Sequence, residues 1–163
     1  MASSKAKTKI ANTEDNIIDI DLSITRKKKF RIDKDNDRIL ELNTSDVTIV
    51  SRMEESYSRL QNLAKNAAEI LSKVEDEDDE ETTLGKGIRE VDKEMRELID
   101  FIFDSNVSEI CAPSGSMYDP FEGTYRYEHI ISTLLNLYSD NIKSETDKIK
   151  KNVSKHTEKY IKK

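Results

Sequence analysis

The chain of 163 residues is poor in the residue types that mark stapled or turn-rich folds, since it has one cysteine, two prolines, four glycines and no tryptophan. A single cysteine cannot close a disulfide within the chain, which excludes a disulfide framework. No apolar run approaches the roughly 18 residues that a membrane-spanning helix needs, so we expect no membrane partner. The polar first residues lack the apolar core of a secretion signal, and we expect a soluble protein of a reducing cytoplasm.

Apolar side chains are also scarce. They make up 35% of the residues, whereas charged side chains make up 37%, against roughly 45–50% and 25% in ordinary globular domains. The core must therefore be thin relative to the surface, as in a domain of elongated helices. The formal net charge of −6 does not give the basic surplus that phosphate binding requires, so nucleic acid is not an expected partner.

Charge is unevenly distributed along the chain. Residues 75–81 are seven consecutive acids, and residues 141–163 contain eight lysines and three acids. We interpret the acidic run as a solvated loop between helices; the alternatives are attraction of a basic partner or of divalent ions. Attraction between the acidic and the basic segment, within one molecule or between two, is a further expectation.

The N-terminal part has the pattern of short strands. Residues 1–16 show no apolar period, and we expect them to be disordered. From Ile18 the pattern alternates with a period of two, which predicts a strand, and a basic turn at 26–29 separates it from a second strand. The apolar positions are Ile18, Ile20, Leu22 and Ile24 in the first strand, and Phe30 and Ile32 in the second. They predict a β-hairpin that packs on helices, because a lone hairpin is marginal in water.

After Asn43 the apolar period becomes helical, with Thr44 or Ser45 as the expected N-cap. The first series, spaced by three and four, is Val50, Met53, Tyr57, Leu60, Ala64, Ala67, Leu71 and Val74. A second series is Leu84, Ile88, Val91, Met95, Leu98 and Ile102. Its regular part is expected to begin near Ile88, because glycines at 85 and 87 disfavour helix. Two heptad seams joined by a polar connector predict an antiparallel helical hairpin.

A third helix is predicted from Tyr127 towards the C-terminal end, and its apolar positions thin out after Asp140. The expected fold is therefore mainly α, with an N-terminal β-hairpin packed on an antiparallel helical hairpin and a third, basic C-terminal helix. We place a single domain at residues 17–140 and a largely solvated basic helix at 141–163.

Two segments contain residue types that bind ions or catalyse reactions. Asp33-Lys-Asp-Asn-Asp37 matches the first ligands of a calcium loop, but Arg38 and Thr44 stand where that loop needs glycine and glutamate, so we interpret it as a surface turn. Cys111 and His129 could form a nucleophile and its base. A free cysteine is more often a small buried hydrophobe, and a histidine at a helix start is usually structural. We therefore predict no catalytic, cofactor or metal site.

The segment from Cys111 to His129 holds both prolines, two of the glycines and three of the six tyrosines. Tyr118-Asp-Pro-Phe121, followed by Gly123, predicts a turn between helices. Its aromatic side chains either cap the core or anchor a partner, and the two roles are compatible. The candidate partner-binding residues are Met117, Tyr118, Phe121, Tyr125 and Tyr127 in this segment, and Met53, Tyr57 and Leu60 in the first long helix.

The expected elements come in a particular order. A hairpin at 19–32 precedes a long helix from Ser45, a second helix that ends in Glu97-Leu-Ile-Asp-Phe-Ile-Phe103, a turn, and a third helix that opens with Arg126-Tyr-Glu-His-Ile-Ile131. This order resembles the small tail assembly chaperones of long-tailed bacteriophages, whose second helix commonly ends in a similar apolar and acidic stretch before a glycine-containing loop. The lysine-rich end and the proline-bearing loop depart from the family pattern.

The resemblance implies a non-catalytic protein in the cytoplasm of the host bacterium. It would bind the tape-measure protein and keep it soluble until tail-tube subunits polymerise around it. We expect helix-to-helix contacts with this client along the faces of residues 50–74 and 84–102. Two other interpretations stay open: a structural component of the virion, such as a connector or tail-completion protein, and a small cytoplasmic enzyme that uses Cys111. Self-association also stays open, because the same heptads serve an intramolecular hairpin or an intermolecular coil.

Overall fold

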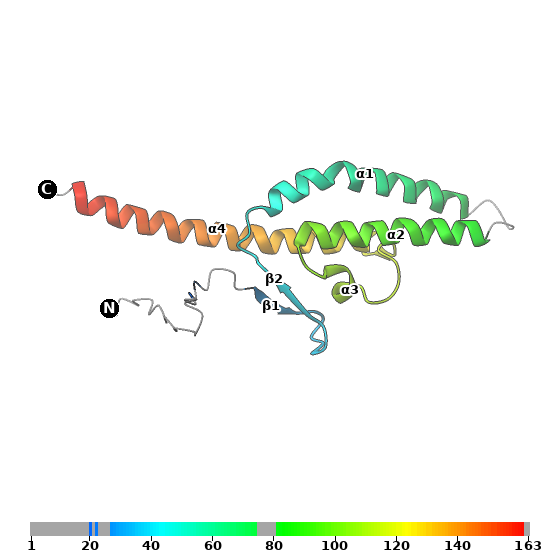
Figure 1. Cartoon of the computed structure of the whole chain (residues 1–163), viewed down its shortest axis with the longest axis horizontal. Coiled ribbons are helices and arrows are strands. Elements are labelled where there is room, and N and C mark those ends of the chain that lie inside the picture. The colour runs from blue at the N-terminus through cyan, green and yellow to red at the C-terminus, as the bar shows by residue number, and fades with distance from the viewer. Residues whose placement is uncertain (1–19, 21, 23–26, 75–80, 162–163) are drawn as a thin grey trace, which may run out of the picture.

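The computed structural model describes residues 20, 22, 27–74 and 81–161. The elements in chain order are β1 (Lys28–Arg31), β2 (Ile39–Leu42), α1 (Ile49–Val74), α2 (Glu81–Phe103), α3 (Val107–Cys111), β3 (Pro120–Phe121), β4 (Thr124–Tyr125) and α4 (Arg126–Ile161). In Figure 1 α1 and α2 lie side by side, the β1–β2 hairpin projects from one side, and the end of α4 extends beyond the other helices. The mainly α fold with an N-terminal hairpin is confirmed.

One strand of the hairpin was expected and the other was not: β1 contains Phe30 of the expected second strand, but its partner is β2 rather than residues 18–24. β1 pairs antiparallel with β2, so that Phe30 lies opposite Leu40. Most of the strand expected at 18–24 lies outside the described residues, and Ile20 and Leu22 are exposed and in no strand. The turn lies at 32–38 rather than at 26–29, and it is closed by the Ile32 amide donating to the Arg38 carbonyl.

A physical reason for this difference lies in the turn chemistry. Asp33 and Lys34 both have positive φ values, of 52° and 60°, and aspartate tolerates that left-handed region better than most residues. The Asp/Asn-rich segment therefore makes the turn, as a surface turn was expected there. Lys28 and Lys29 lie inside β1, and Leu40 and Leu42 of β2 are fully buried. The apolar face that packs on the helices thus comes mainly from β2.

The start of α1 differs from the expected cap. The helix begins at Ile49, and Asp46, rather than Thr44 or Ser45, accepts hydrogen bonds from the backbone N–H and the hydroxyl of Thr48, at 2.9 and 2.6 Å. Ser45 instead accepts a hydrogen bond from Asn141 of α4. Thr44 and Ser45 therefore help to join the hairpin connection to α4 and do not cap α1.

The antiparallel α1–α2 hairpin is confirmed. Its interface contains one row of α1, which we call the inner row: Ile49, Ser56, Leu63 and Ala67, all buried. Facing it, α2 buries Val91, Met95, Leu98, Ile99 and Ile102. α2 begins at Glu81 rather than near Ile88 and includes both of its glycines. A Cβ at Gly87 would lie 3.4 Å from Ile70 Cδ1, so the glycine there allows a close approach of α1.

The expected seam of α1 is wrong at two positions. Val50 and Tyr57 are each 58% exposed, whereas their neighbours Ile49 and Ser56 are buried. The apolar face of α1 is wide enough to contain two adjacent rows of residues. The heptad pattern in the sequence predicted the row that contains Val50 and Tyr57, which is the more exposed of the two. The inner row was not predicted because one of its buried positions is Ser56, and a serine does not indicate a core position in an apolar pattern.

The two halves of α4 have different surroundings. The first half buries Tyr127, Ile130, Ile131, Leu134 and Tyr138. Asn141 marks the border, where it donates to the Thr44 carbonyl at 3.2 Å and is hydrogen-bonded by Lys28. Beyond it the helix extends away from the core, as Figure 1 shows, and Ile149 is exposed. The expected basic, largely solvated helical end is confirmed for the described residues.

Candidate functional site

The segment from Ala112 to Tyr125, which we call the elbow, joins α3 to α4 and is fixed by side chains of α2. Arg96 is the first of them. Its Nε donates to Asp92 at 2.8 Å, and its Nη atoms donate to the carbonyls of Ala112 and Gly115 at 2.9 and 2.7 Å. A guanidinium can satisfy several carbonyls at once because its five N–H donors lie in a fixed plane. The start of the elbow is therefore attached to α2.

Asp92 of α2 accepts hydrogen bonds from the next part of the elbow. Its Oδ1 accepts hydrogen bonds from the Ser116 hydroxyl, at 2.9 Å, and from the Met117 backbone N–H. Burial alone would raise the pKa of Asp92, but the hydrogen bonds from Arg96, Met117 and Ser116 outweigh it and hold the pKa below its ordinary value. The ionised carboxylate is thus a structural anchor, and none of its hydrogen-bond partners is a reacting group.

A second ion pair closes the elbow onto the start of α4. Arg126 donates to Asp119 at 3.0 Å and to the Ser114 carbonyl at 2.6 Å, and Asp119 also accepts from the Ser116 amide. Gly115 has φ of +76°, and a Cβ there would lie 2.4 Å from Asp119 Oδ2. Glycine is required at this position for both its positive φ and the close approach of the carboxylate.

The tip of the elbow is a tight hairpin. β3 pairs with β4, with Phe121 opposite Thr124. The two residues between them, Glu122 and Gly123, have φ values of 48° and 82°, as a two-residue type I′ turn requires. The turn was expected at Tyr118–Phe121, but Pro120 and Phe121 form β3, and Glu122 and Gly123 make the turn. Phe121 lies at the surface, where its side chain is 40% exposed.

The aromatic candidates divide into a buried and a surface group. Met117, Tyr118 and Tyr127 belong to the core, and the Tyr118 and Tyr127 rings pack edge to face at 5.4 Å. Tyr125 is half-buried and stacks on Tyr127 at 6.0 Å. Burial raises the pKa of Tyr127 to about 12. These four residues cap the core, so Phe121 is the elbow aromatic with a ring open to a partner.

Short helix α3 is held at both ends. Asp100 of α2 accepts from the Ser108 amide and hydroxyl, at 2.7 and 2.8 Å. At the other end, Arg38 of the hairpin donates to the carbonyls of Ile110 and Cys111, at 2.9 and 2.8 Å. Arginine at a helix C-terminus satisfies carbonyls that lack partners within the helix. This helix was not expected from the sequence.

Cys111 and His129 line the same cleft, but their surroundings do not favour catalysis. Burial raises the pKa of the Cys111 thiol to about 11, and the lowering effect of the Arg38 charge does not offset it. The thiol is therefore protonated near neutral pH, whereas a nucleophilic cysteine needs its thiolate. His129 packs against Phe121, with ring centroids 4.6 Å apart. The surroundings of both residues therefore favour a structural role.

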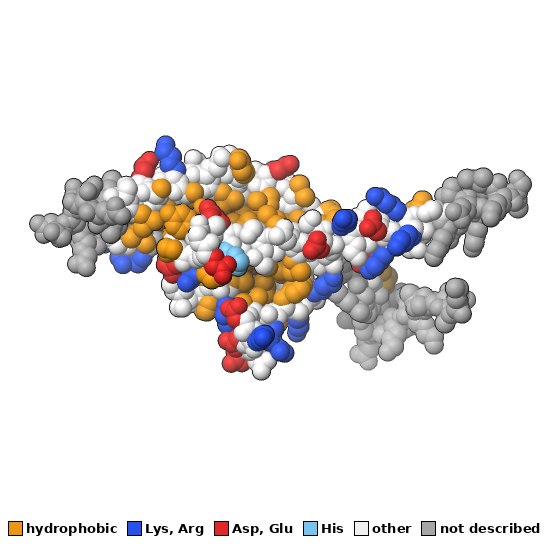
Figure 2. Space-filling view, turned by 180° about the vertical axis from the view of Figure 1, so that it is seen from behind, with side chains coloured by type: hydrophobic (Ala, Val, Ile, Leu, Met, Phe, Trp, Pro, Cys, Tyr) orange, Lys and Arg blue, Asp and Glu red, His pale blue; other side chains and the backbone are white. Residues whose placement is uncertain are grey.

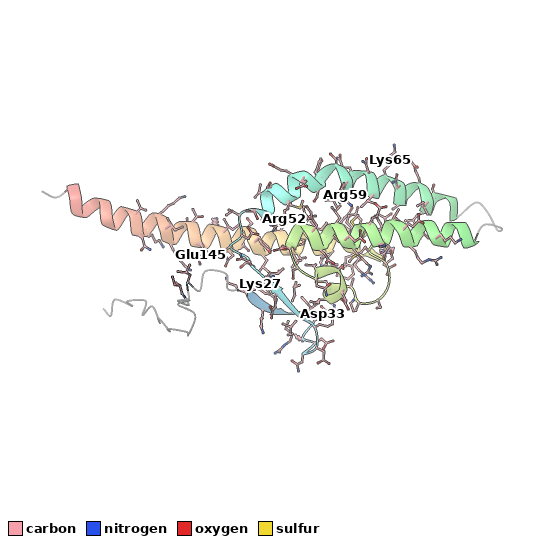
Figure 3. The ribbon with its side chains drawn as sticks, viewed as in Figure 1. Lys27, Asp33, Arg52, Arg59, Lys65 and Glu145 are labelled. Atoms are coloured by element: carbon pink, nitrogen blue, oxygen red, sulfur yellow. The ribbon has the colours of Figure 1, made fainter. Side chains whose placement is uncertain are left out.

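The described part of the chain holds no cluster of three or more histidine, cysteine, aspartate or glutamate side chains suited to a metal ion. In the Asp33–Asp37 turn, Asp33 pairs with Arg38 at 2.9 Å, and Asp35 accepts from the Asp37 amide. Figure 3 shows Asp33 in the turn of the β1–β2 hairpin.

A second apolar row on α1 lies beside the inner row, and we call it the outer row: Val50, Met53, Tyr57, Leu60 and Ala64. Met53, Leu60 and Ala64 are half-buried, whereas Val50 and Tyr57 are exposed. The Tyr57 hydroxyl accepts a hydrogen bond from Gln61 at 3.0 Å. Figure 2, which views the molecule from behind, shows hydrophobic side chains gathered on that face, without assigning them to this row. Met53 and Leu60 pack against the edge of the core, so Tyr57 is the one of these three candidates whose side chain is mostly open to solvent.

Comparisons with known proteins found no matching family model, no matching curated protein and no matching solved structure. Among the described helices, none has both the length and the apolar character needed to cross a membrane.

Proposed function

We propose that this chain is a non-catalytic protein-binding module that docks an amphipathic helix of its client on the outer row of α1. The observation that carries this proposal is an apolar row with heptad spacing at the edge of the core, in which Val50 and Tyr57 are each 58% exposed while the other three residues are half-buried. Exposed apolar strips of this kind are typical of interaction sites.

The spacing of the outer row suits a helical partner. Val50, Met53, Tyr57, Leu60 and Ala64 follow one another at intervals of three and four residues, which places them in one strip down the helix. At 1.5 Å per residue this strip is about 21 Å long, or roughly four turns. A second helix with the same spacing can insert its side chains between these residues, as in a coiled coil.

Exposure suggests how the energy of binding is distributed along the row. Met53 and Leu60 are half-buried at the base, and Tyr57 stands more than half exposed between them. A tyrosine offers a large apolar surface with few rotatable bonds, and tyrosines are common among residues that dominate binding energies. We therefore assign Tyr57 the largest share.

Charged residues border the row on its solvent side. Glu54 and Lys65 are both exposed, and Figure 3 shows Lys65 on α1 well away from Arg52 at its start. Their opposite charges favour a partner helix with complementary charges at those two points, which would set its orientation.

The more specific role within this proposal is that of a tail assembly chaperone in the cytoplasm of a host bacterium. It is supported by the order of hairpin, two long helices, turn and third helix. In this role the client is a tape-measure protein, a long helical chain whose apolar rows must be shielded from water until tail-tube subunits polymerise around it. The outer row supplies one such cover, because helix-to-helix contact removes apolar surface of the client from water.

The test is co-expression with a tape-measure protein and recovery of the soluble complex. We expect the wild-type chain to keep the client soluble and to co-purify with it. The double variant Val50→Ser and Tyr57→Ser should lower recovery by about tenfold, since two exposed apolar anchors are lost. The matched control is Phe101→Ser, which removes an aromatic ring that is 42% exposed on α2 and should leave recovery unchanged.

Two results would contradict the proposal. One is a client that is equally soluble without this chain. The other is a double variant that recovers as much client as the wild type. Presence of the chain in purified phage particles would instead support the structural interpretation, since an assembly chaperone leaves before the particle is complete.

A further inference from the structure

A cleft of about 490 Å³ lies between the hairpin turn, the end of α3, the elbow and α4. Its volume falls within the roughly 300–1,000 Å³ that is typical of small-molecule sites. It contains no residue of α1, so it is separate from the outer row.

The cleft has apolar surfaces from three parts of the fold. Ile32 comes from the hairpin, Ala112 and Pro113 from the start of the elbow, and Ile130 and Leu134 from α4. Ala112, Ile130 and Leu134 belong to the core and are buried. These side chains are held by the core packing, so the floor of the cleft is preformed.

Positive charge dominates the lining. Arg31, Arg38 and Arg126 face the cleft from the hairpin and from α4, and Asp33 is the one acidic residue of the lining. Arg38 is paired with Asp33, and Arg126 with Asp119 outside the lining, at 2.9 and 3.0 Å. Arg31 forms no ion pair with any residue that the structure describes.

We propose that this cleft binds a small amphipathic carboxylate, with its apolar body on Ile32, Ile130 and Leu134 and its carboxylate on Arg31. Arginine suits this role, because its planar N–H donors match the two oxygens of a carboxylate. The charge of Arg31 disfavours amphipathic cations, and an uncharged apolar molecule can form no ion pair with it. This binding is independent of the client, because it needs neither the outer row nor a protein partner.

The first test measures binding of decanoate to the full chain by isothermal titration calorimetry, with decanol as the uncharged comparison. We expect saturable binding of decanoate that is at least about tenfold tighter than that of decanol, because decanol lacks the charged hydrogen bonds. Arg31→Glu should weaken decanoate binding by about tenfold or more for the same reason. Thr133→Trp, at an exposed position of the lining, should fill the cleft and abolish binding.

The matched control is Lys86→Glu, which reverses one exposed cation on α2 outside the lining and should leave decanoate binding unchanged. Circular dichroism checks that every variant keeps its helical content. The proposal is overturned if the wild type shows no saturable binding of decanoate, or if Arg31→Glu and Thr133→Trp bind it as tightly as the wild type does.

The second test uses Cys111, the single cysteine of the chain, which also lines the cleft. Its reaction with a thiol reagent such as dithionitrobenzoate can be followed without labelling any other residue. We expect decanoate to slow this reaction, and decanol at the same concentration to slow it much less. A rate that is unchanged by saturating decanoate would overturn the placement of the ligand in this cleft.

Discussion

The inner and outer rows of α1 lie side by side on one helix and have nearly the same spacing, yet their surroundings differ. Ile49, Ser56 and Leu63 of the inner row are buried, while Val50 and Tyr57 of the outer row are each 58% exposed. The inner row lies in the α1–α2 interface, whereas the outer row combines Met53 and Leu60, which pack against the edge of the core, with the exposed Val50 and Tyr57. The comparison shows that a heptad pattern identifies an apolar helix face without identifying the surface that covers it.

The largest effect should follow a substitution in the inner row. Leu63→Ala removes buried methyl groups from the α1–α2 interface, where Leu63 is 4% exposed. We expect the free energy of unfolding to fall by about 3 kcal/mol, because the lost burial and the remaining cavity both destabilise the fold. Urea denaturation followed by circular dichroism measures this change. A loss below about 1 kcal/mol would place Leu63 outside the core packing.

A somewhat smaller effect is expected from the polar support of the elbow. Arg96→Ala removes three hydrogen bonds to carbonyls, at Ser108, Ala112 and Gly115, and the ion pair with Asp92. We expect a loss of about 2 kcal/mol, since partly buried carbonyls lose their donor. Limited proteolysis should also show faster cleavage within the elbow. Unchanged stability together with unchanged proteolysis would show that α2 does not hold the elbow.

The contribution of Asp92 should depend on pH. Its pKa in the folded state lies below the ordinary value of 3.8, so its ionised form stabilises the fold at higher pH, and this stabilisation is lost as the pH falls through the folded pKa. Between about pH 5 and pH 3 the wild type should therefore lose more stability than Asp92→Asn does. Denaturation curves across this range give both slopes, and equal slopes would contradict the assignment.

The smallest effect on stability should come from the outer row. Tyr57→Ser removes a ring that is 58% exposed, so we expect the free energy of unfolding to change by less than about 0.5 kcal/mol. The same denaturation assay applies. A loss comparable to that of Leu63→Ala would show that Tyr57 belongs to the core and would remove the distinction between the two rows.

Much of the helical fold could be predicted from the sequence, because long apolar periods carry strong signals. The apolar series through Met95, Leu98 and Ile102 predicted α2. The thinning of apolar positions after Asp140 predicted the solvated end of α4. A hairpin was predicted, and the strand around Phe30 corresponds to β1, but its partner strand β2 was not predicted. There the aspartate-rich turn outweighed the alternation further upstream, and β1 proved to be rich in lysine.

The polar structure around the elbow could not be predicted. Asp92 and Arg96 are four residues apart on a helix, which in a sequence is typical of a solvent-exposed ion pair. Only the folded elbow brings the Ala112 and Gly115 carbonyls to Arg96. Cys111 and His129 flank the elbow and line the same cleft, but the burial that raises the pKa of the thiol could not be predicted from the sequence.

The most direct measurement of the central claim is site-specific photocross-linking in cells that co-express the chain and a tape-measure protein. A photoreactive phenylalanine analogue replaces Tyr57 in one variant and Phe101 in another, so that both probes are exposed aromatic positions on long helices. We predict a cross-link to the client from position 57 and little or none from position 101. Equal cross-linking from both positions, or none from position 57, would contradict docking of the client on the outer row.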